Sequence, residues 1–262
     1  MPSSPITLTD PDDPAFDDFR DLTDADVRPD RRGVVIAEGV NVVERLLHSP
    51  YPVRAVIGVP ARLEALAPAL AGHDVPVLSV DKWLLSQVVG FRVTRGVLAS
   101  ADRLPPRDPD ELIAASPRLA VLESLNDFEN LGSLFRNAAA FGVDGVLLDP
   151  QCADPLYRRS VRVSMGHVLR VPFAVLPGAW PEALDRVRAG GHRVLAMTPR
   201  GEVDLRRAEV PARWALLLGA EGPGLSPATL AAADNRVRIP MADGVDSLNV
   251  ATAAAVGFAR LC

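Results

Sequence analysis

The chain has 262 residues, of which 48% are hydrophobic and 23% are charged, and it carries a net charge of −5. This length and balance predict one large or two modest folded domains and exclude an intrinsically disordered chain. No apolar run reaches the roughly 18 residues that a membrane-spanning helix needs, and residues 1–14 lack the basic start and apolar core of a secretory signal, so we expect a cytoplasmic protein with no membrane partner.

The negative charge is concentrated at the start of the chain. Residues 1–30 contain nine aspartates and two arginines, which gives a local charge of −7. Because the whole chain has a net charge of −5, residues 31–262 have a net charge of +2. We expect residues 1–29 to form a solvated, partly ordered acidic extension. The alternative is that this extension competes with RNA for the basic surface of residues 31–262. Cys152 and Cys262 lie far apart and outside any metal-binding spacing, which favours reduced thiols over a disulfide or a zinc site.

Residues 30–104 alternate β-rich and helical segments, and this alternation predicts a compact α/β domain. We expect strands at 33–37, 53–59, 75–80 and 95–100, and helices at 39–49, 61–72 and 81–90. Residues 105–117 are rich in proline and charge, which is typical of a linker with one short helix.

Residues 118–262 alternate in the same way, but their strands are more continuously apolar, as in a parallel sheet that is covered on both faces. We expect strands at 119–124, 144–149, 193–198, 213–220 and 236–241, and helices at 130–142, 155–166, 179–191, 226–234 and 247–261. The pattern predicts a doubly wound α/β domain. Ligands of such sheets bind where the carboxyl ends of strands turn into helices.

Two of the strand-end loops in this domain carry residues suited to a ligand. In 126–137, Asn130 is predicted to cap a helix, and Arg136 lies about 9 Å further along the helix axis. In 219–226, three glycines let the backbone turn sharply and approach a ligand closely. Their spacing is not that of the dinucleotide fingerprint, so a simple turn is an equal alternative.

The third strand-end loop, 241–249, leads into the last helix of the chain. Ser247 is predicted to cap this helix, and Asn249 is predicted to lie in its first turn. The helix is apolar on nearly every side, so it needs cover all round. We therefore expect it to pack both within its own domain and against a second subunit.

Three segments containing these loops, NDFENLGSLFRNAAAFGVDGVLL, LLLGAEGPGLS and IPMADGVDSLNVATAAA, resemble motifs 1, 2 and 3 of the SpoU, or TrmH-type, RNA ribose methyltransferases in order and spacing. The resemblance covers residues 119–261. Residues 31–103, with VVIAEGVNVVERLL and RGVLAS, resemble the small ribosomal-protein-like RNA-binding domain that precedes the catalytic domain in many members.

The resemblance implies an α/β fold in which the small RNA-binding domain precedes a trefoil-knotted, parallel-sheet methyltransferase domain. It further implies S-adenosylmethionine bound in the knotted loops and a homodimer whose two chains complete the site. The knot is implied by the resemblance alone, because the pattern of elements by itself fits an ordinary open sheet.

The resemblance also implies the site residues. The catalytic candidates are Asn130, Arg136, Glu221, Ser247 and Asn249. The cofactor-binding candidates are Leu218, Gly219, Glu221, Gly222, Ile239, Met241, Ser247, Leu248 and Asn249. The guanidinium of Arg136 is a poor general base, so we expect it to bind the phosphate beside the target ribose and to favour the alkoxide. Support of the loops is the competing role for Glu221 and Ser247.

Further arginines are candidates for RNA binding. They are Arg158, Arg159, Arg162 and Arg170, with Phe91, Arg92 and Arg95 as weaker candidates. Arginines on one side of a helix can follow an RNA backbone, and a solvated helix face is an equal alternative.

The sequence thus predicts an S-adenosylmethionine-dependent RNA 2′-O-methyltransferase that acts on ribosomal or transfer RNA, releases S-adenosylhomocysteine and uses no metal. One alternative is a knotted methyltransferase that modifies a base. Another is a noncatalytic RNA-binding protein that keeps the fold. A Rossmann-type dehydrogenase is disfavoured, because its glycine fingerprint and a hydride-transfer partner are missing.

Overall fold

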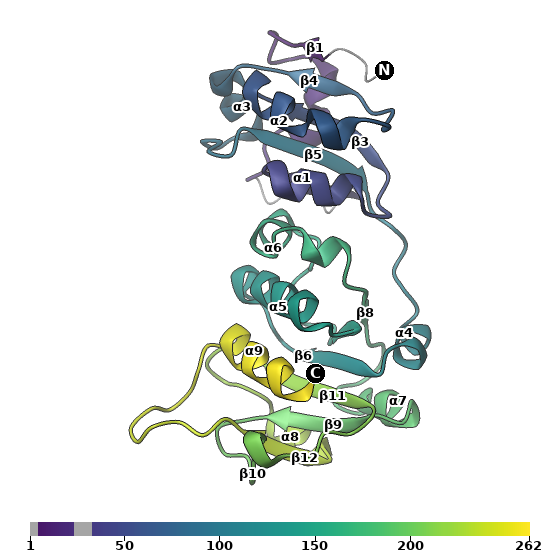
Figure 1. Ribbon diagram of the computed structural model, residues 1–262, viewed down its shortest axis with the longest axis vertical. Helices are drawn as coiled ribbons and strands as arrows, with labels where there is room; N and C mark the ends of the chain where they lie inside the picture. Colours follow the sequence, from purple (N-terminus) through teal and green to yellow (C-terminus); the bar gives the residue numbers. More distant parts are fainter. Residues whose placement is uncertain (1–4, 24–32) are drawn as a thin grey trace. The chain divides into compact units, whose positions relative to one another are not determined.

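The computed structural model describes residues 5–23 and 33–262, which divide into two compact units. The first unit extends to Pro105 and also includes Leu156–Leu169, and the second contains Pro106–Pro155 and Arg170–Cys262. Figure 1 shows both units, with labels on most of their helices and strands.

The first unit is built on a five-stranded mixed sheet with the strand order β1-β4-β3-β5-β2. Its strands are β1 (Ile6–Thr7), β2 (Val34–Glu38), β3 (Val53–Gly58), β4 (Val77–Ser79) and β5 (Val97–Asp102). The helices are α1 (Val40–Leu47), α2 (Pro60–Leu70) and α3 (Lys82–Val89). Strand β5 pairs antiparallel with β2 and β3, whereas β4 pairs parallel with β1 and β3. Every residue of β2 is buried, and both α1 and α6 (Arg158–Val163) contact this strand.

The acidic N-terminal segment belongs to the first unit wherever the structure describes it. Strand β1 extends the sheet beside β4, and the 3-10 helix η1 (Pro14–Phe19) buries Phe16 and Phe19 completely. The expectation of a solvated extension is therefore wrong for residues 5–23. The reason is that Phe16, Phe19 and Leu22 stand between the aspartates and pack in the core of this unit. The rest of the expected extension, residues 1–4 and 24–29, lies outside the described residues.

A segment from the second half of the sequence also belongs to the first unit. It contains helix α6 (Arg158–Val163) and the 3-10 turn η3 (His167–Leu169). Arg158 donates from Nη1 to Oε2 of the buried Glu38 at 2.8 Å, and its guanidinium carbon lies 4.3 Å from the centroid of the Phe91 ring. Arg45 donates a hydrogen bond to the backbone carbonyl of Met165. The sequence pattern, which groups 155–166 with residues 118–262, does not reveal this association.

The second unit has a seven-stranded sheet with the order β10-β12-β9-β11-β6-β7-β8. Every neighbouring pair in it is parallel, which confirms the predicted α/β class with a parallel sheet. Its strands are β6 (Arg118–Glu123), β7 (Gly145–Leu148), β8 (Phe173–Val175), β9 (Arg193–Met197), β10 (Val203–Asp204), β11 (Trp214–Gly219) and β12 (Asn235–Arg238). The sequence reading omits the short strands β8 and β10, whose length gives little periodic signal.

The helices of the second unit are α4 (Pro109–Ala115), α5 (Phe128–Phe141), α7 (Leu184–Ala189), α8 (Pro227–Ala232) and α9 (Val250–Leu261), with a 3-10 helix η4 (Leu205–Arg207). Helix α4 occupies the segment expected to be a linker, and its Leu112 and Ile113 are buried in the core of this unit. Helix α9 lies beside α5 and also packs on β11 (Figure 1). A Cβ atom at Gly257 would lie 2.6 Å from Leu216, so glycine lets α9 approach the sheet closely.

Within residues 5–23 and 33–262, no helix has both the length and the apolar character that crossing a bilayer requires. Cys152 and Cys262 are both free thiols. Burial is the main cause that raises the pKa of each thiol. Neither cysteine is therefore prepared for thiolate chemistry.

Candidate functional site

The three strand-end loops predicted from sequence all leave the sheet of the second unit at carboxyl ends of strands. Strands β6 and β11 are parallel neighbours, and Glu123 at the end of β6 is in register with Gly219 at the end of β11. The loop after β6 therefore starts beside the loop after β11. The third loop follows β12 and leads into α9, which packs beside the first helix of the site, α5.

Helix α5 is capped by Asp127, whereas the sequence predicts Asn130 as the cap. Oδ1 of Asp127 accepts from the backbone nitrogens of Glu129 at 3.0 Å and Asn130 at 2.7 Å. That prediction is wrong because Asp127 satisfies the free N–H groups first. The side chain of Asn130 is consequently available for contacts outside its own helix.

Asn130 joins all three loops through its side-chain amide. Its Nδ2 donates to Oε2 of Glu221 at 2.6 Å, and its Oδ1 accepts from Nδ2 of Asn249 at 2.7 Å. Only 7% of Asn130 is exposed, so these two bonds satisfy a nearly buried polar group. The structure thus brings together three residues that are far apart in sequence and that the motifs predict as site residues.

Asn249 is the N-cap of α9, whereas the sequence predicts Ser247. Oδ1 of Asn249 accepts from the backbone nitrogens of Ala251 at 3.0 Å and Thr252 at 3.3 Å. Because its oxygen faces the helix, its Nδ2 faces Asn130, and this fixes the orientation of the Asn130 amide as well. Ser247 lies in the loop before the helix.

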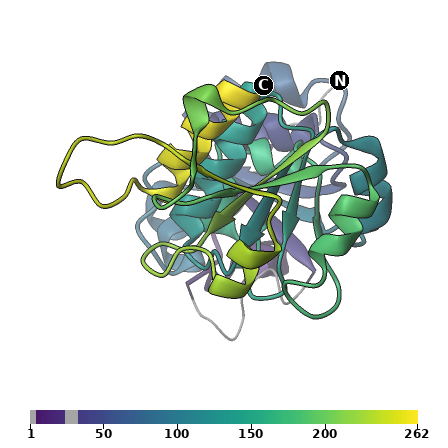
Figure 2. The same ribbon diagram turned by 90° about the horizontal axis from the view of Figure 1, so that it is seen from below.

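The loop that carries Ser247 is open to solvent. Residues 242–249 are all exposed, and Figure 2 shows the segment between β12 and α9 extending away from the sheet. Leu248 is 39% exposed and Val245 is 48% exposed, although both side chains are apolar. These two side chains are therefore accessible to a ligand or to another chain.

The loop from Gly219 to Ser226 folds tightly back on itself. A Cβ atom at Gly219 would lie 2.3 Å from the carbonyl carbon of Gly224, so only glycine fits there. Gly222 has a φ of +90° and open space on the side where a Cβ would lie. The backbone of this loop is therefore accessible to a ligand.

Apolar residues stand next to these polar groups. Leu218 is buried at the end of β11, and Ile239 and Met241 after β12 are partly exposed. Ile239 and Met241, together with the exposed Leu248, provide an apolar surface, whereas Leu218 is covered. A mostly apolar surface with a few fixed polar contacts is the usual composition of a small-molecule site.

Arg136 lies on α5 and is exposed. Among the residues that the structure describes, it has neither a hydrogen-bond partner nor an ion-pair partner. An exposed guanidinium with no protein partner is available to bind a phosphate.

The other predicted RNA-binding arginines that lie in the first unit come from two stretches of sequence. One stretch contains Phe91 and Arg92, and the other contains Arg158 and Arg159. The guanidinium of Arg158 lies over the ring of Phe91, so this contact brings the two stretches together. Arg92, Arg95 and Arg159 are exposed, and Arg162 is partly exposed. The side chain of Arg158 is 15% exposed and engaged with Glu38, so little of it can reach a phosphate.

Sequence reasoning missed two buried carboxylates at the strand ends. Glu123 is 5% exposed at the end of β6, and Asp149 is 3% exposed just after β7. Asp149 accepts from the backbone nitrogen and the hydroxyl of Ser124, a non-glycine residue with a φ of +52°. The sequence contained one signal for these buried carboxylates, because in LAVLE and GVLLD an acidic residue directly ends an apolar run.

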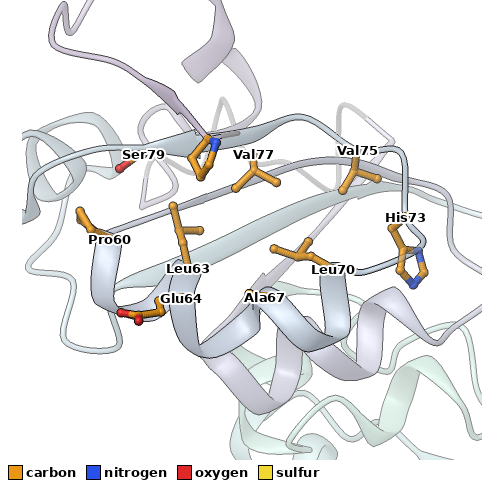
Figure 3. A pocket seen from close by; sticks show the side chains of 10 residues that line it. Pro60, Leu63, Glu64, Ala67, Leu70, His73, Val75, Val77 and Ser79 are labelled. Atoms are coloured by element: carbon orange, nitrogen blue, oxygen red, sulfur yellow. The ribbon is translucent and has the colours of Figure 1, made fainter. Parts of the chain in front are cut away.

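A cavity of about 500 Å³ lies in the first unit, between α2 and strand β4 (Figure 3). Leu63, Leu70 and Val77 give it a largely apolar lining, with Glu64 and His73 as polar members. No sequence-predicted site residue is among its lining residues, so it is separate from the strand-end loops. Among the described residues, no group of three or more histidine, cysteine, aspartate or glutamate side chains is arranged to hold a metal ion.

A model of the SpoU rRNA Methylase family matches residues 117–259 of the chain. The chain belongs to this family. The resemblance seen in the three sequence motifs is thereby confirmed, and the protein is an RNA methyltransferase of the SpoU family. The matched range includes every candidate residue of the strand-end loops.

Individual relatives agree with this SpoU assignment. A protein of Mycobacterium tuberculosis, named as an uncharacterized tRNA/rRNA methyltransferase, is 50% identical over 258 residues, which covers 96% of this chain and 89% of the relative. A 23S rRNA guanosine-2′-O-methyltransferase of Ralstonia nicotianae is 31% identical over 199 residues, covering 74% of this chain and 80% of the relative. The crystal structure of an AdoMet-bound rRNA methyltransferase from Sinorhizobium meliloti is similar to this SpoU chain, with a TM-score of 0.81, 26% identity and coverage of 97% of this chain and 96% of that one.

Proposed function

We propose that this SpoU-family protein transfers a methyl group from S-adenosylmethionine to a ribose 2′-hydroxyl of ribosomal or transfer RNA. The observation that carries the proposal is the meeting of Asn130, Glu221 and Asn249, one from each motif loop, at 2.6 and 2.7 Å. The relative from Ralstonia nicotianae, named as a 2′-O-methyltransferase, supports the ribose as acceptor. The AdoMet-bound structure from Sinorhizobium meliloti supports the methyl donor.

The residues of the strand-end loops fit S-adenosylmethionine in their chemistry. Ile239 and Met241 offer apolar surface for an adenine, and the buried Leu218 is proposed to shape the pocket behind it. The backbone at Gly219 and Gly222 is open enough to approach the polar edges of the adenine. When it is bound, this cofactor supplies an activated methyl group as a sulfonium. Leu248, Ser247, Glu221 and Asn249 complete the proposed cofactor-binding set. Leu248 and Ser247 are exposed in a single chain, whereas Asn130 holds Glu221 and Asn249 in place.

Arg136 is the proposed residue for positioning RNA and stabilising charge at the acceptor. Its guanidinium stays protonated at ordinary pH, so it cannot take the proton of the 2′-hydroxyl. It instead binds the phosphate next to the target ribose and stabilises the developing alkoxide, while the proton leaves to that phosphate or to water. Its exposure and the lack of a partner among the described residues support this role.

Asn130, Glu221 and Asn249 are proposed to hold the reacting groups in place rather than to exchange protons. The helix cap at Asn249 fixes the direction of both amides, so the Glu221 carboxylate receives a donor from a defined position. Such preorganised groups lower the cost of aligning two reactants. Ser247 lies two residues before the cap, and its exposed hydroxyl is proposed to contact the cofactor or the ribose.

We propose that the first unit binds the RNA substrate. Arg92, Arg95 and Arg159 are exposed there, and the Phe91–Arg158 contact draws their two stretches of chain together. Clustered arginines attract a phosphate backbone without reading its sequence, so this surface would add affinity rather than choose a nucleotide.

We also propose the family's homodimer and its trefoil knot for this chain. Exposed apolar side chains on α5, on α9 and on the loop before α9 support a second subunit as their cover. They are Phe141, Val256, Val245 and Leu248. The knot is proposed from membership of the family.

Two measurements test the proposed function. Calorimetry with S-adenosylhomocysteine measures whether the purified chain binds the product of the donor. Transfer of a labelled methyl group to ribosomal and transfer RNA, followed by nucleoside analysis, then identifies the acceptor atom. Binding together with 2′-O-methylnucleosides supports the proposal. Binding with a methylated base favours the base methyltransferase, and RNA binding without cofactor binding favours the noncatalytic protein.

A further inference from the structure

Glu123 ends strand β6 with its carboxylate buried beside the loop 219–226. We infer that Glu123 is a positioning residue that fixes this loop in the conformation the cofactor requires. The inference rests on the proposed function, because it assigns a task to a residue outside the family motifs. Two observations support it: the hydrogen bonds that the carboxylate accepts, and the attachment of both ends of the loop to Glu123.

Both carboxylate oxygens of Glu123 accept hydrogen bonds. Oε1 accepts from Nε1 of Trp180 at 2.9 Å and from the hydroxyl of Thr229 at 2.8 Å. Oε2 accepts from the backbone nitrogen of Ser226 at 3.0 Å. Hydrogen bonds to a charged acceptor are stronger than neutral ones and hold their partners in a defined geometry.

The same glutamate holds both ends of the loop. At its start, Gly219 is the in-register partner of Glu123 in the parallel pair of β11 and β6. At its end, the backbone nitrogen of Ser226 donates to the Glu123 carboxylate. A bridge between Ala220 and Gly224 ties the loop to itself in between. The seven residues after Gly219 therefore start and finish at one residue of β6.

Thr229 strengthens the far end of the loop. Ser226 caps helix α8 by accepting from the backbone nitrogen of Thr229 at 3.2 Å, and its hydroxyl donates to the Thr229 hydroxyl at 2.9 Å. Thr229 is completely buried and donates in turn to Glu123. The end of the loop and the start of α8 are thus one hydrogen-bonded group centred on the carboxylate.

The loop that Glu123 holds contains a residue of the candidate site. Glu221 lies in the held loop and meets Asn130 at 2.6 Å. A displacement of the loop by about 1 Å would take this pair out of hydrogen-bond range. Burying a carboxylate costs free energy that an apolar residue of similar size would avoid, so core packing alone does not explain why a glutamate occupies position 123. Placement of the loop explains it.

The test compares Glu123→Gln with a matched control, a carboxylate that holds the other end of strand β6. The control is Asp144→Asn, because Asp144 also accepts three hydrogen bonds, all from Arg118 at the opposite end of β6. For each variant, the Kd for S-adenosylhomocysteine is measured by calorimetry at a fixed interval below its own melting temperature. In Glu123→Gln an NH₂ group replaces one carboxylate oxygen. Because every partner of this carboxylate is a hydrogen-bond donor, the NH₂ group faces a donor and cannot accept from it. We expect the Kd of this variant to rise about tenfold or more.

The control separates loop placement from general stability. We expect Asp144→Asn to lower the melting temperature and to leave the Kd within about twofold of wild type. In steady-state assays, Glu123→Gln should raise KM for S-adenosylmethionine by a larger factor than it lowers kcat at saturation. Equal cofactor affinities for wild type and Glu123→Gln, or equal losses in both variants, would overturn the inference.

A second pair of variants covers the case in which Glu123→Gln does not fold. Thr229→Val removes the hydroxyl that links Glu123 to Ser226 and keeps the side-chain shape, whereas Thr229→Ser keeps the hydroxyl. We expect the Kd to rise in Thr229→Val and to return toward wild type in Thr229→Ser. A wild-type protein that binds no S-adenosylhomocysteine overturns the proposed function and this inference together, whereas unchanged affinity in Thr229→Val overturns the inference alone.

Discussion

Asn249 donates from its side-chain amide to Oδ1 of Asn130 at 2.7 Å, across 119 positions of sequence. The same asparagine caps α9, so one side chain both starts the last helix and orients the amide that reaches Glu221. Two functions of Asn249 can therefore be separated by substitution, because capping requires an acceptor and the contact with Asn130 requires a donor.

Asn249→Asp keeps the acceptor and removes the donor. We expect the melting temperature to stay close to that of wild type, since aspartate caps helices as well as asparagine does. Methyl transfer should fall by at least about tenfold, because the carboxylate cannot donate to Asn130 and repels its oxygen. Asn249→Ala should lose both activity and about 1 kcal/mol of stability. Full activity in Asn249→Asp would show that the contact with Asn130 does not matter for transfer.

Arg136→Ala removes the proposed phosphate-binding guanidinium from an exposed position. We expect kcat for RNA methylation to fall roughly a hundredfold, a typical effect of removing one preorganised group that stabilises transition-state charge. Stability and the Kd for S-adenosylhomocysteine should stay nearly unchanged, because no described residue bonds to Arg136. A variant that methylates RNA at the wild-type rate would exclude Arg136 from the catalytic step.

Arg158→Ala leaves the carboxylate of Glu38 buried without its partner. Glu38 is 2% exposed, so we expect a loss of about 3–5 kcal/mol in the free energy of unfolding, measured by urea denaturation. The control Arg92→Ala removes an exposed arginine in the same unit and should change stability by less than about 0.5 kcal/mol. Should Arg158→Ala unfold at the same urea concentration as wild type, the ion pair would be energetically unimportant.

The Arg158 pair also affects how RNA-binding data are interpreted. Loss of RNA affinity in Arg158→Ala would reflect a damaged first unit. Loss of affinity in Arg92→Ala with unchanged stability, and with a weaker dependence on salt, would indicate a phosphate contact.

Stability should decrease in mild acid because of His192. This residue is 4% exposed, and its Nε2 lies 2.7 Å from the carbonyl oxygen of Ser116. Burial lowers the pKa of His192 below its ordinary value of 6.5, although the Ser116 carbonyl opposes that shift. The unfolded chain therefore takes up a proton at a higher pH than the folded chain does. Stability is retained above pH 6.5 and is lost as the pH falls below it.

The measurement is the urea midpoint between pH 7.5 and 5.5 for wild type and for His192→Gln. The variant cannot titrate at this position, so its midpoint should fall less steeply than that of wild type. Parallel profiles would show that His192 does not contribute to the pH dependence.

The sequence was sufficient to predict that the three motif loops leave one sheet at the carboxyl ends of its strands, because parallel strands place these ends along one edge. It was insufficient to predict which polar residue caps each helix. Asp127 and Asn130 are both good caps within one turn, as are Ser247 and Asn249, and only the path of the backbone decides between them.

Other features depend on contacts between distant parts of the chain. The donors of Glu123 come from residues more than 50 positions away, so a local pattern contains no trace of them. The place of α6 in the first unit similarly depends on Arg158 meeting Glu38 across 120 positions. The burial of Phe16 and Phe19 could have been inferred, since two aromatic residues in an acidic segment are unusual for a solvated chain.

The most direct test of the central claim is a map of 2′-O-methylated positions in ribosomal and transfer RNA from cells with and without the gene. The account predicts that at least one ribose methylation is missing without the gene, is restored by the wild-type protein and is not restored by Arg136→Ala. Identical 2′-O-methylation in both cells, or loss of a base methylation instead, would contradict it.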